Sequence, residues 1–487
     1  MTSAPPLRRP LILASIMAAS FMIAIEATIV STAMPQIVAH LGDLKLYSWV
    51  FSSFLLAQAA TTVLFGKLAD IYGRKATLLV GLAIFVGGSI LCGFAWSMLS
   101  LIAFRLVQGL GAGAVQPVAI TVVGDLYPAH ERGKVTGYLA SVWGISSILG
   151  PLAGGLIIQH ASWAWIFWIN VPLGIAAALG FFLFLREDLT HQRRSVDVIG
   201  AVLFTVVVSS LMLALTEAGS AGGRTSGIST LVCIASSILF VAQERRAAEP
   251  MISFALWGRR VMATANLATL CSGMALIGLT TFLPMYVQAV LNRSALVAGF
   301  TLTVVVLGWP IGSTIAARNF RRFGLRPLLL FGAILLPIGS LAFLVLRPGM
   351  SPLLPAAGSL LMGFGMGFVS TTSTVIIQDS VGWAERGVAT ASLIFARNLG
   401  STLGAAVLGA MLNVGLLHGP VPVSSAQIRA LLDHRVAATG DFAVRSALDQ
   451  ALHLTFFGII AVSVATLLFA LLVPHVTLTE PARADAA

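Results

Sequence analysis

Long apolar runs separated by short polar segments dominate the chain. Fourteen runs are long enough to cross a bilayer as helices, since about 20 residues rising 1.5 Å each span its hydrocarbon core. The eighth run is the shortest. The predicted spans cover residues 11–36, 48–66, 76–96, 98–123, 135–158, 163–185, 198–217, 226–243, 261–290, 295–317, 327–346, 353–377, 388–415 and 452–474. An even number of spans places both ends of the chain on the same side of the membrane.

Composition and charge agree with a membrane protein. The 487 residues are 57% hydrophobic and only 10% charged, whereas about a quarter of a soluble globular protein is charged. With the N-terminus inside, 20 of the 29 Lys and Arg residues fall on the cytoplasmic side, seven outside and two within spans. This asymmetry follows the positive-inside rule. The basic excess is divided among short loops, so we expect contact with membrane lipids and no nucleic-acid partner.

A charged hairpin joins the second and third spans. It reads Gly-Lys-Leu-Ala-Asp-Ile-Tyr-Gly-Arg-Lys from Gly66 to Lys75. Gly66 and Gly73 suit turns or close backbone approach, and Asp70 sits at a helix end with Arg74 just beyond it. An ordinary basic loop is the alternative.

Two ionisable residues lie deep within predicted spans of the first half. Glu26 is about 15 residues into an apolar run and is the only carboxylate so deep. A buried acid is costly and therefore points to function, in this case proton coupling; a neutral, hydrogen-bonded structural Glu is the alternative. Arg105 must face a partner or a water-filled cavity, and Gln108 follows one turn later on the same helix face. A purely structural Arg105 is the alternative here.

The fifth and sixth spans carry small and aromatic residues in fixed order. The fifth contains Gly150, Pro151, Gly154 and Gly155, where proline kinks the helix and glycines let another helix approach closely. The sixth opens with the string Trp-Ala-Trp-Ile-Phe-Trp-Ile-Asn-Val-Pro-Leu-Gly at 163–174. Its aromatic residues suit a membrane interface.

The second half of the chain repeats the first at an offset of 254 residues. The segment from Asp125 to Arg132 reappears as the segment from Asp379 to Arg386, and 312–326 is a degenerate copy of the charged hairpin. Such repeats are typical of secondary transporters, with the substrate site between the halves. We therefore predict an N-terminal half (1–185), an inserted helix pair (186–260), a C-terminal half (261–475) and a cytoplasmic tail (476–487). Arg397 lies within a span of the second half, and a structural pair on the cytoplasmic side is the plain interpretation.

These motifs resemble those of the major facilitator superfamily. The hairpin resembles the loop between helices 2 and 3, Arg105 to Gly109 the R-x-x-Q-G motif, and Gly150 to Gly155 the antiporter motif of exporters. The string at 163–174 and the first span resemble the fourteen-helix drug:proton antiporter family. Two residues depart from that family's pattern, Glu26 in place of Asp and Ala164 in place of Arg, so no role of that Arg is transferred.

The resemblance implies an all-α integral membrane protein of the major facilitator fold, with two six-helix halves and an inserted pair. It implies a proton-coupled antiporter that exports drug-like or amphipathic small molecules across a bacterial inner membrane by alternating access, with both termini cytoplasmic. In the family the charged loop gates the cytoplasmic side, and we assign the repeated Asp125, Arg132, Asp379 and Arg386 to the same switch. An exporter of lipids, siderophores or secondary metabolites on the same fold is the alternative.

A membrane enzyme or a nucleotide-driven pump is disfavoured. The His residues lie mainly in loops or at helix ends, and no phosphate-binding loop of the G-x-x-x-x-G-K-[ST] type is present. We expect no cofactor and no metal. A single deep acid suggests a small lipophilic, neutral or cationic substrate exchanged for protons, and a periplasmic adaptor is left open. The residues expected to line the cavity are polar or aromatic: Gln58, Gln108, Asn266, Gln288 and Trp309.

Overall fold

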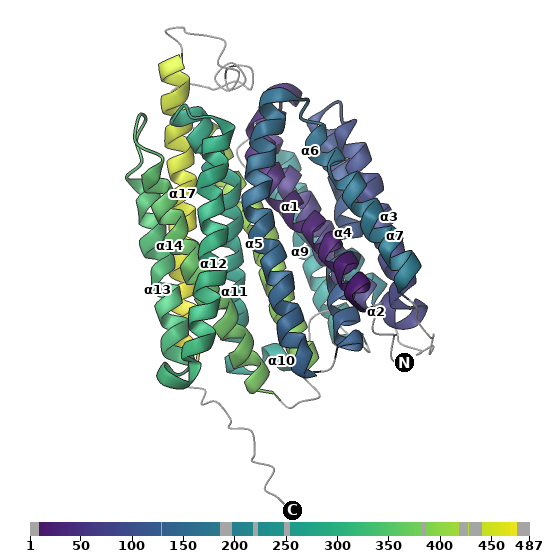
Figure 1. Ribbon diagram of the computed structural model, residues 1–487. Helices are drawn as coiled ribbons and strands as arrows, with labels where there is room; N and C mark the ends of the chain where they lie inside the picture. Colours follow the sequence, from purple (N-terminus) through teal and green to yellow (C-terminus); the bar gives the residue numbers. More distant parts are fainter. Residues whose placement is uncertain are drawn as a thin grey trace, which may run out of the picture.

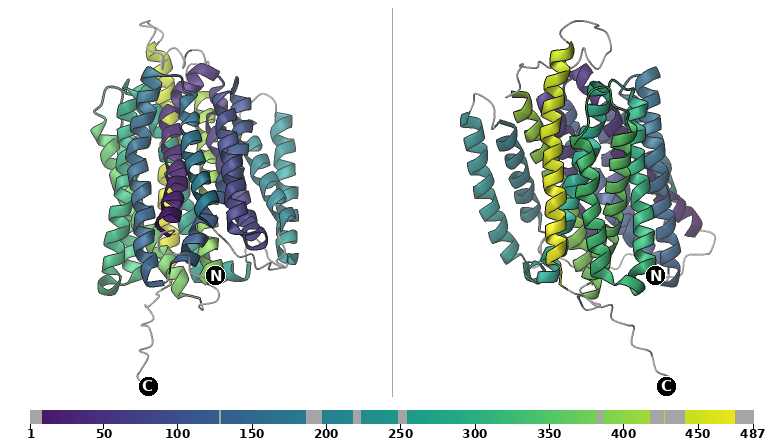
Figure 2. Two further views of the ribbon diagram at one scale, coloured as in Figure 1. Left: turned by 45° about the vertical axis from the view of Figure 1, so that its right-hand side comes forward. Right: turned by 90° about the vertical axis from the view of Figure 1, so that its left-hand side faces the viewer.

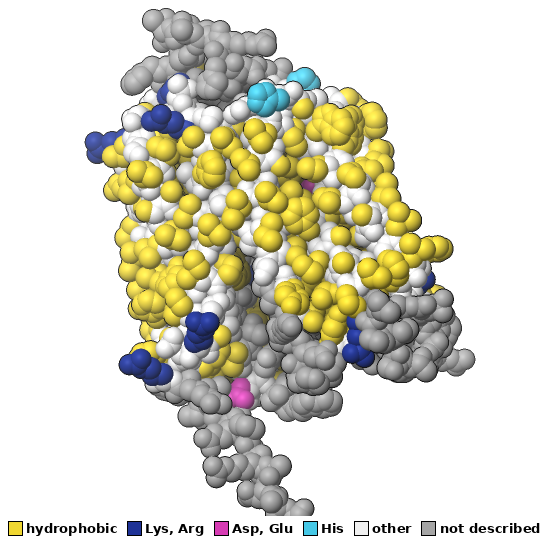
Figure 3. Space-filling view, in the orientation of Figure 1, with side chains coloured by type: hydrophobic (Ala, Val, Ile, Leu, Met, Phe, Trp, Pro, Cys, Tyr) yellow, Lys and Arg dark blue, Asp and Glu magenta, His cyan; other side chains and the backbone are white. Residues whose placement is uncertain are grey.

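The computed structural model describes residues 9–127, 129–185, 197–217, 223–247, 254–381, 386–417, 427 and 441–474. In these ranges every regular element is a helix and none is a strand, as predicted (Figure 1). Thirteen helices are long and apolar enough to cross a membrane, and a fourteenth has a shorter apolar part at Ile199–Leu215. Hydrophobic side chains cover the middle of the visible face, and Lys and Arg gather at its two ends (Figure 3).

The helices form two halves with a pair between them in sequence. The first half contains α1 (Arg9–Leu41), the short turn η1 (Leu44–Leu46), α2 (Tyr47–Tyr72), α3 (Arg74–Gly93), α4 (Met98–Leu126), α5 (Ala129–His160), α6 (Trp165–Trp168) and α7 (Asn170–Phe184). The pair is α8 (Val198–Glu217) and α9 (Gly223–Arg246). The second half contains α10 (Phe254–Trp257), α11 (Arg260–Met285), η2 (Tyr286–Val290), α12 (Ala295–Phe323), α13 (Leu325–Leu344), α14 (Leu353–Asp379), α15 (Arg386–Leu417) and α17 (Asp441–Leu472).

The pair α8–α9 lies at the edge of the bundle, as both views in Figure 2 show. The two helices pack on each other, and α8 also packs on α2 and α15. Phe204 of α8 stacks at 5.4 Å between ring centroids on Phe395 of α15. The pair thus covers the outside of the seam where α2 meets α15.

Several helices extend a few residues beyond the predicted spans, and two differences go further. The last helix begins at Asp441 and not at residue 452, because Val444, Ala447, Leu448 and Ala451 recur at helical spacing and are buried. The sixth span is interrupted between α6 and α7. The amphipathic helix predicted at 424–436 lies outside the described residues, apart from residue 427.

The charged hairpin is as tight as predicted, but one of its two glycines is not needed for it. α2 ends at Tyr72 and α3 begins at Arg74, so Gly73 alone makes the turn, with φ +92° and ψ +152°. Gly324 makes the equivalent turn between α12 and α13, with φ +78°, as the internal repeat requires. Gly66 instead lies within α2, and a Cβ there would meet nothing within 4 Å.

The halves meet along α5–α12 and α2–α15, and α1 touches α11. The described chain begins and ends on one side of the bundle (Figure 1); we call the opposite side the far side. There, hydrogen bonds join the halves: Ser31 Oγ donates to the Thr280 carbonyl, Tyr47 Oη to the Thr281 carbonyl at 2.8 Å, and Gln288 Nε2 to the Thr32 carbonyl at 3.1 Å. We call these contacts the far-side seam, and they join the two halves on this side.

The two hairpin glycines give a matched test of the fold. The φ and ψ angles of Gly73 lie in a region that is essentially restricted to glycine, so Gly73→Ala should destabilise the protein by about 1–3 kcal/mol. Gly66→Ala should leave stability unchanged or slightly raised, since alanine favours helix. Thermal unfolding of both variants in detergent measures the change in stability. Equal losses of stability in the two variants would contradict the assignment of the turn to Gly73 alone.

Candidate functional site

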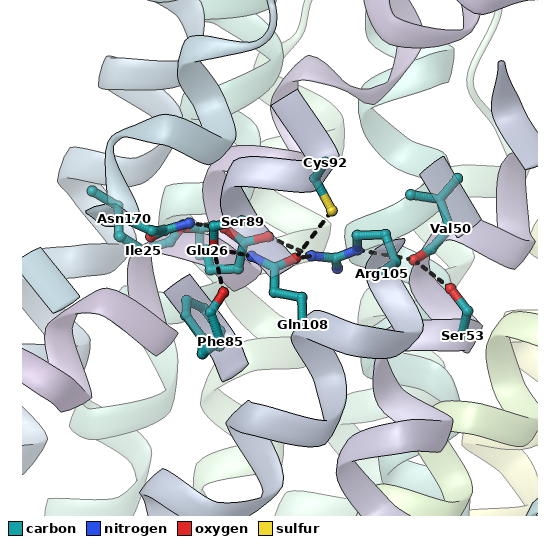
Figure 4. Close-up of polar contacts among 11 residues, drawn as sticks. Ile25, Glu26, Val50, Ser53, Phe85, Ser89, Cys92, Arg105, Gln108 and Asn170 are labelled. Atoms are coloured by element: carbon teal, nitrogen blue, oxygen red, sulfur yellow. Dashed lines mark hydrogen bonds and ion pairs between the residues drawn. The ribbon is translucent and has the colours of Figure 1, made fainter. Parts of the chain in front are cut away.

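The candidate site is a polar cluster inside the first half, centred on Glu26 of α1. The Glu26 side chain is fully buried. Arg105 of α4 forms an ion pair through Nη1 with Glu26 Oε1, and Asn170 Nδ2, at the start of α7, donates to Glu26 Oε2 (Figure 4). Both carboxyl oxygens therefore accept a hydrogen bond, an arrangement that suits an ionised carboxylate.

Arg105 is held from several directions. Its Nε donates to the Val50 carbonyl of α2 at 3.2 Å, and Nη1 also donates to Gln108 Oε1 at 2.6 Å. The guanidinium carbon lies 4.2 Å from the ring centroid of Phe54 and 6.0 Å from that of Phe167. Aromatic faces attract cations at such distances, so the two rings help to hold the guanidinium in place. They add no negative charge beside that of Glu26.

Gln108 extends the network to α3. Its Nε2 donates to Ser89 Oγ at 2.8 Å, Ser89 Oγ donates to the Phe85 carbonyl at 2.9 Å, and Cys92 Sγ lies 3.8 Å from Gln108 Oε1. Five helices of the first half, α1, α2, α3, α4 and α7, thus meet at one cluster (Figure 4). Because the cluster is buried, its charges interact more strongly than they would in water.

The sequence located most of this cluster. It predicted that Arg105 needs a partner and that Gln108 shares its helix face, and the geometry agrees with both. Asn170 was not singled out, although it is the one amide in the string at 163–174. Ser89 was also missed, since a serine in an apolar run is commonplace.

The antiporter motif on α5 packs against both halves. A Cβ at Gly154 would lie 3.2 Å from the Ile29 carbonyl of α1, and one at Gly155 would lie 3.1 Å from Leu296 Cα of α12. Gly150 faces Thr28 of α1, and Pro151 lies against Gly299 of α12. The glycines therefore permit the close approach that the sequence predicted, and they bring α1 and α12 onto opposite sides of one helix.

Three of the five residues expected to line the cavity are enclosed in this conformation. Gln108 belongs to the charged cluster, Asn266 donates to Ser392 Oγ at 2.9 Å, and Gln288 belongs to the far-side seam. All three are at most 3% exposed, because each amide bonds a neighbouring helix instead of facing open space. Gln58 is 9% exposed and Trp309 is half-buried.

The gate residues are only partly described. The side chains of Asp70, Asp125, Arg132 and Arg386 lie outside the described part of the structure. Arg74 and Asp379 are half-buried and have interaction partners. The gating roles of these residues stay predictions. Within the described residues, no three His, Cys, Asp or Glu side chains gather into a group that could hold a metal ion.

This chain, with two helical halves and a charged cluster buried inside the first of them, is a multi-pass membrane transporter. The chain belongs to the Major Facilitator Superfamily, whose family model matches residues 16–405. It is 38% identical over 395 residues to Multidrug resistance protein 3 of Bacillus subtilis, covering 80% of this chain and 76% of that protein. It is 33% identical over 414 residues to Multidrug transporter protein MdtP of the same organism, covering 83% and 76%.

A solved structure agrees at the level of the fold. The crystal structure of a bacterial homologue of the human lysosomal transporter Spinster, in an inward-facing and occupied conformation, superposes with a TM-score of 0.69. The match covers 96% of this chain and 97% of that one at 15% sequence identity. The predicted superfamily and fold class are thereby confirmed.

The ion pair predicts a strong energetic coupling. Removing one partner of a buried pair leaves an uncompensated charge and costs about 3–5 kcal/mol. Glu26→Gln and Arg105→Gln should each destabilise the protein by about this amount, and the double variant should lose clearly less than the sum. Denaturant unfolding in detergent measures the cycle. Ser359→Ala, at a buried hydroxyl in the second half, is the control: its loss of stability should add to that of either single variant. If the losses from Glu26→Gln and Arg105→Gln also added, the pairing would be contradicted.

Proposed function

We propose that this protein is a proton-coupled antiporter that exports amphipathic small molecules from the cytoplasm by alternating access. The multidrug transporters that it resembles support export of such compounds. The observation that carries the proton coupling is the enclosed pair of Glu26 and Arg105, because it is a titratable group held by a partner that a proton would displace.

The orientation belongs to the same proposal. We assign the side that holds the chain ends to the cytoplasm of a bacterial inner membrane, since the excess of Lys and Arg falls on that side. In this orientation the far-side seam faces outward, and the described conformation is closed to the outside.

Proton uptake and the ion pair compete for the same carboxyl group. A protonated Glu26 carries no charge and gives up its Coulomb attraction to Arg105. Arg105 keeps its hydrogen bonds to the Val50 carbonyl and to Gln108, so the guanidinium stays on α4 while α1 is released from it. The proton therefore loosens α1 from α4, and loss of the proton draws the two helices together.

α1 also carries the far-side seam. Ser31 and Thr32 lie five and six residues beyond Glu26 and bond the second half through Thr280 and Gln288. A helix transmits a shift over this distance of about 8–9 Å, at 1.5 Å per residue. Protonation at Glu26 thus favours opening of the seam to the outside, and deprotonation favours the closed seam, so the protonation state of Glu26 is coupled to the conformation of the seam.

The charge of Glu26 does not by itself select a cationic cargo. The expectation of a neutral or cationic substrate rested on Glu26 as the single deep acid. Arg105 balances that charge in the described conformation, so the cluster has no net charge to attract a cation.

Glu26 gives the direct test of this function. Glu26→Gln should abolish export driven by an imposed pH gradient in proteoliposomes, because the amide cannot exchange a proton. Glu26→Asp should keep partial activity, since it retains the carboxyl group on a shorter side chain. Uptake of a fluorescent multidrug substrate into inverted vesicles measures both, with the exposed Arg347→Gln as a control of unchanged activity. Uphill export by Glu26→Gln at the wild-type rate would remove Glu26 as the coupling residue.

A further inference from the structure

Arg397 on α15 is a second arginine at membrane depth, and it differs from Arg105 in having no partner among the described residues. It lies within the apolar segment Ser392–Leu417. Its guanidinium makes no hydrogen bond or ion pair with the described part of the chain, and its nitrogens are not among the enclosed atoms that lack a partner. Every guanidinium nitrogen therefore reaches solvent-accessible space.

That space lies inside the molecule. Arg397 is half-buried by exposed area, yet protein surrounds it as fully as it surrounds a core residue. A side chain that is surrounded and still accessible faces an internal hollow. α15 packs against α11 of its own half and against α2 of the other half, so a hollow beside this helix adjoins the division between the halves.

The internal repeat supports this placement. At the offset of 254 residues, Arg397 corresponds to Trp143 on α5, which is 37% exposed. The backbones nearby are closely packed in both halves: a Cβ at Gly273 would lie 2.6 Å from the Arg397 carbonyl, and Gly154 lies close to α1 in the same way. The side chain at this position is thus partly exposed in both halves, although the backbone around it is closely packed.

We propose that Arg397 binds the anionic group of the cargo, so that the exported molecules include amphipathic organic anions such as carboxylates or sulfonates. A guanidinium does not give up its proton and presents a fork of donors that matches a planar oxyanion. Water can solvate Arg397 while the hollow is open. When the halves close over the cargo, an unpaired cation at this depth becomes costly, and an anionic group removes that cost.

This inference deepens the proposed function, on which it rests for the direction of transport, and it names the cargo class. The cluster at Glu26 carries no net charge because Arg105 balances it. Arg397 is then the one uncompensated charge at membrane depth among the described residues. Its field attracts anions and disfavours cations.

Two probes that differ by one charged group test the proposal. Anilinonaphthalene sulfonate is an amphipathic anion, and N-phenylnaphthylamine is the same skeleton without the sulfonate. Both become fluorescent in apolar sites, so each can be titrated onto the purified protein in nanodiscs, with empty nanodiscs subtracted. No pH gradient is present, so binding is read separately from proton coupling.

Arg397→Gln should weaken binding of the sulfonate by about tenfold or more, the worth of one charge-assisted pair, and change binding of the neutral probe by less than about twofold. Arg397→Lys should recover most of the affinity for the sulfonate. Arg347→Gln removes a positive charge from an exposed site of the same half and should bind both probes as the wild type does. Elution profile and Tm confirm that each variant is folded.

Three results would overturn the assignment. The wild type would bind the sulfonate no more tightly than the neutral probe, Arg397→Gln would weaken both probes equally, or it would weaken neither. Glu26→Gln should still bind the sulfonate in this assay. Uphill export by Glu26→Gln would contradict the proposed coupling and leave the binding result intact, so the two ideas fail separately.

Discussion

A carboxylate in the interior of a membrane protein is tolerated only while something balances its charge. Here Glu26 is balanced by Arg105 and Asn170, and the rest of the first half is arranged to keep that balance. α2 supplies the Val50 carbonyl and the Phe54 ring, and Gln108 ties α4 to α3. Because charge joins Glu26 to Arg105, we infer that a proton on Glu26 loosens α1 from α4, while the contacts of Arg105 with α2 and Gln108 remain.

The glycines of α5 connect the packing of α1 to the boundary between the two halves. They bring α1 within backbone contact of α5 and bring α12 onto the other side of the same helix. A movement of α1 therefore changes the packing at the boundary between the halves. The far-side seam at Ser31 and Thr32 lies on the same helix as the acid, which joins the proposed proton site to the proposed gate without an intermediate element.

Hydrophobic periodicity was sufficient for the fold and for the residues that membrane burial makes conspicuous. Glu26, Arg105 and the turn at Gly73 could be found because a charge in an apolar run, or a glycine between two spans, has few alternative explanations. Asn170 could not, because a polar residue within an aromatic string also suits the membrane interface. The start of α17 was missed because its first turns are polar on one face and their buried face is revealed only by packing.

The sequence also could not distinguish buried polar residues that line a cavity from buried polar residues that bond another helix. Asn266 and Gln288 have the composition of cavity residues, yet each bonds another helix in the described conformation. A sequence shows that a buried amide needs a partner, and only the three-dimensional arrangement shows whether that partner is water, cargo or protein. Arg397 shows the opposite case. The sequence suggested that it forms a structural pair, yet it has no partner within the described chain.

The central claim is that Glu26 is ionised while the far side is closed and protonated when it opens. Cysteines at 155 and 296 can lock the closed state, since a Cβ at Gly155 would lie 3.3 Å from Leu296 Cβ, near the separation that a disulfide spans. Infrared difference spectroscopy then compares the oxidised and reduced protein at acidic pH, with Glu26→Gln in the same background identifying the band. The account predicts that the carbonyl stretch of a protonated Glu26 is absent from the locked protein and present after reduction; the band at full intensity in the locked protein would contradict it.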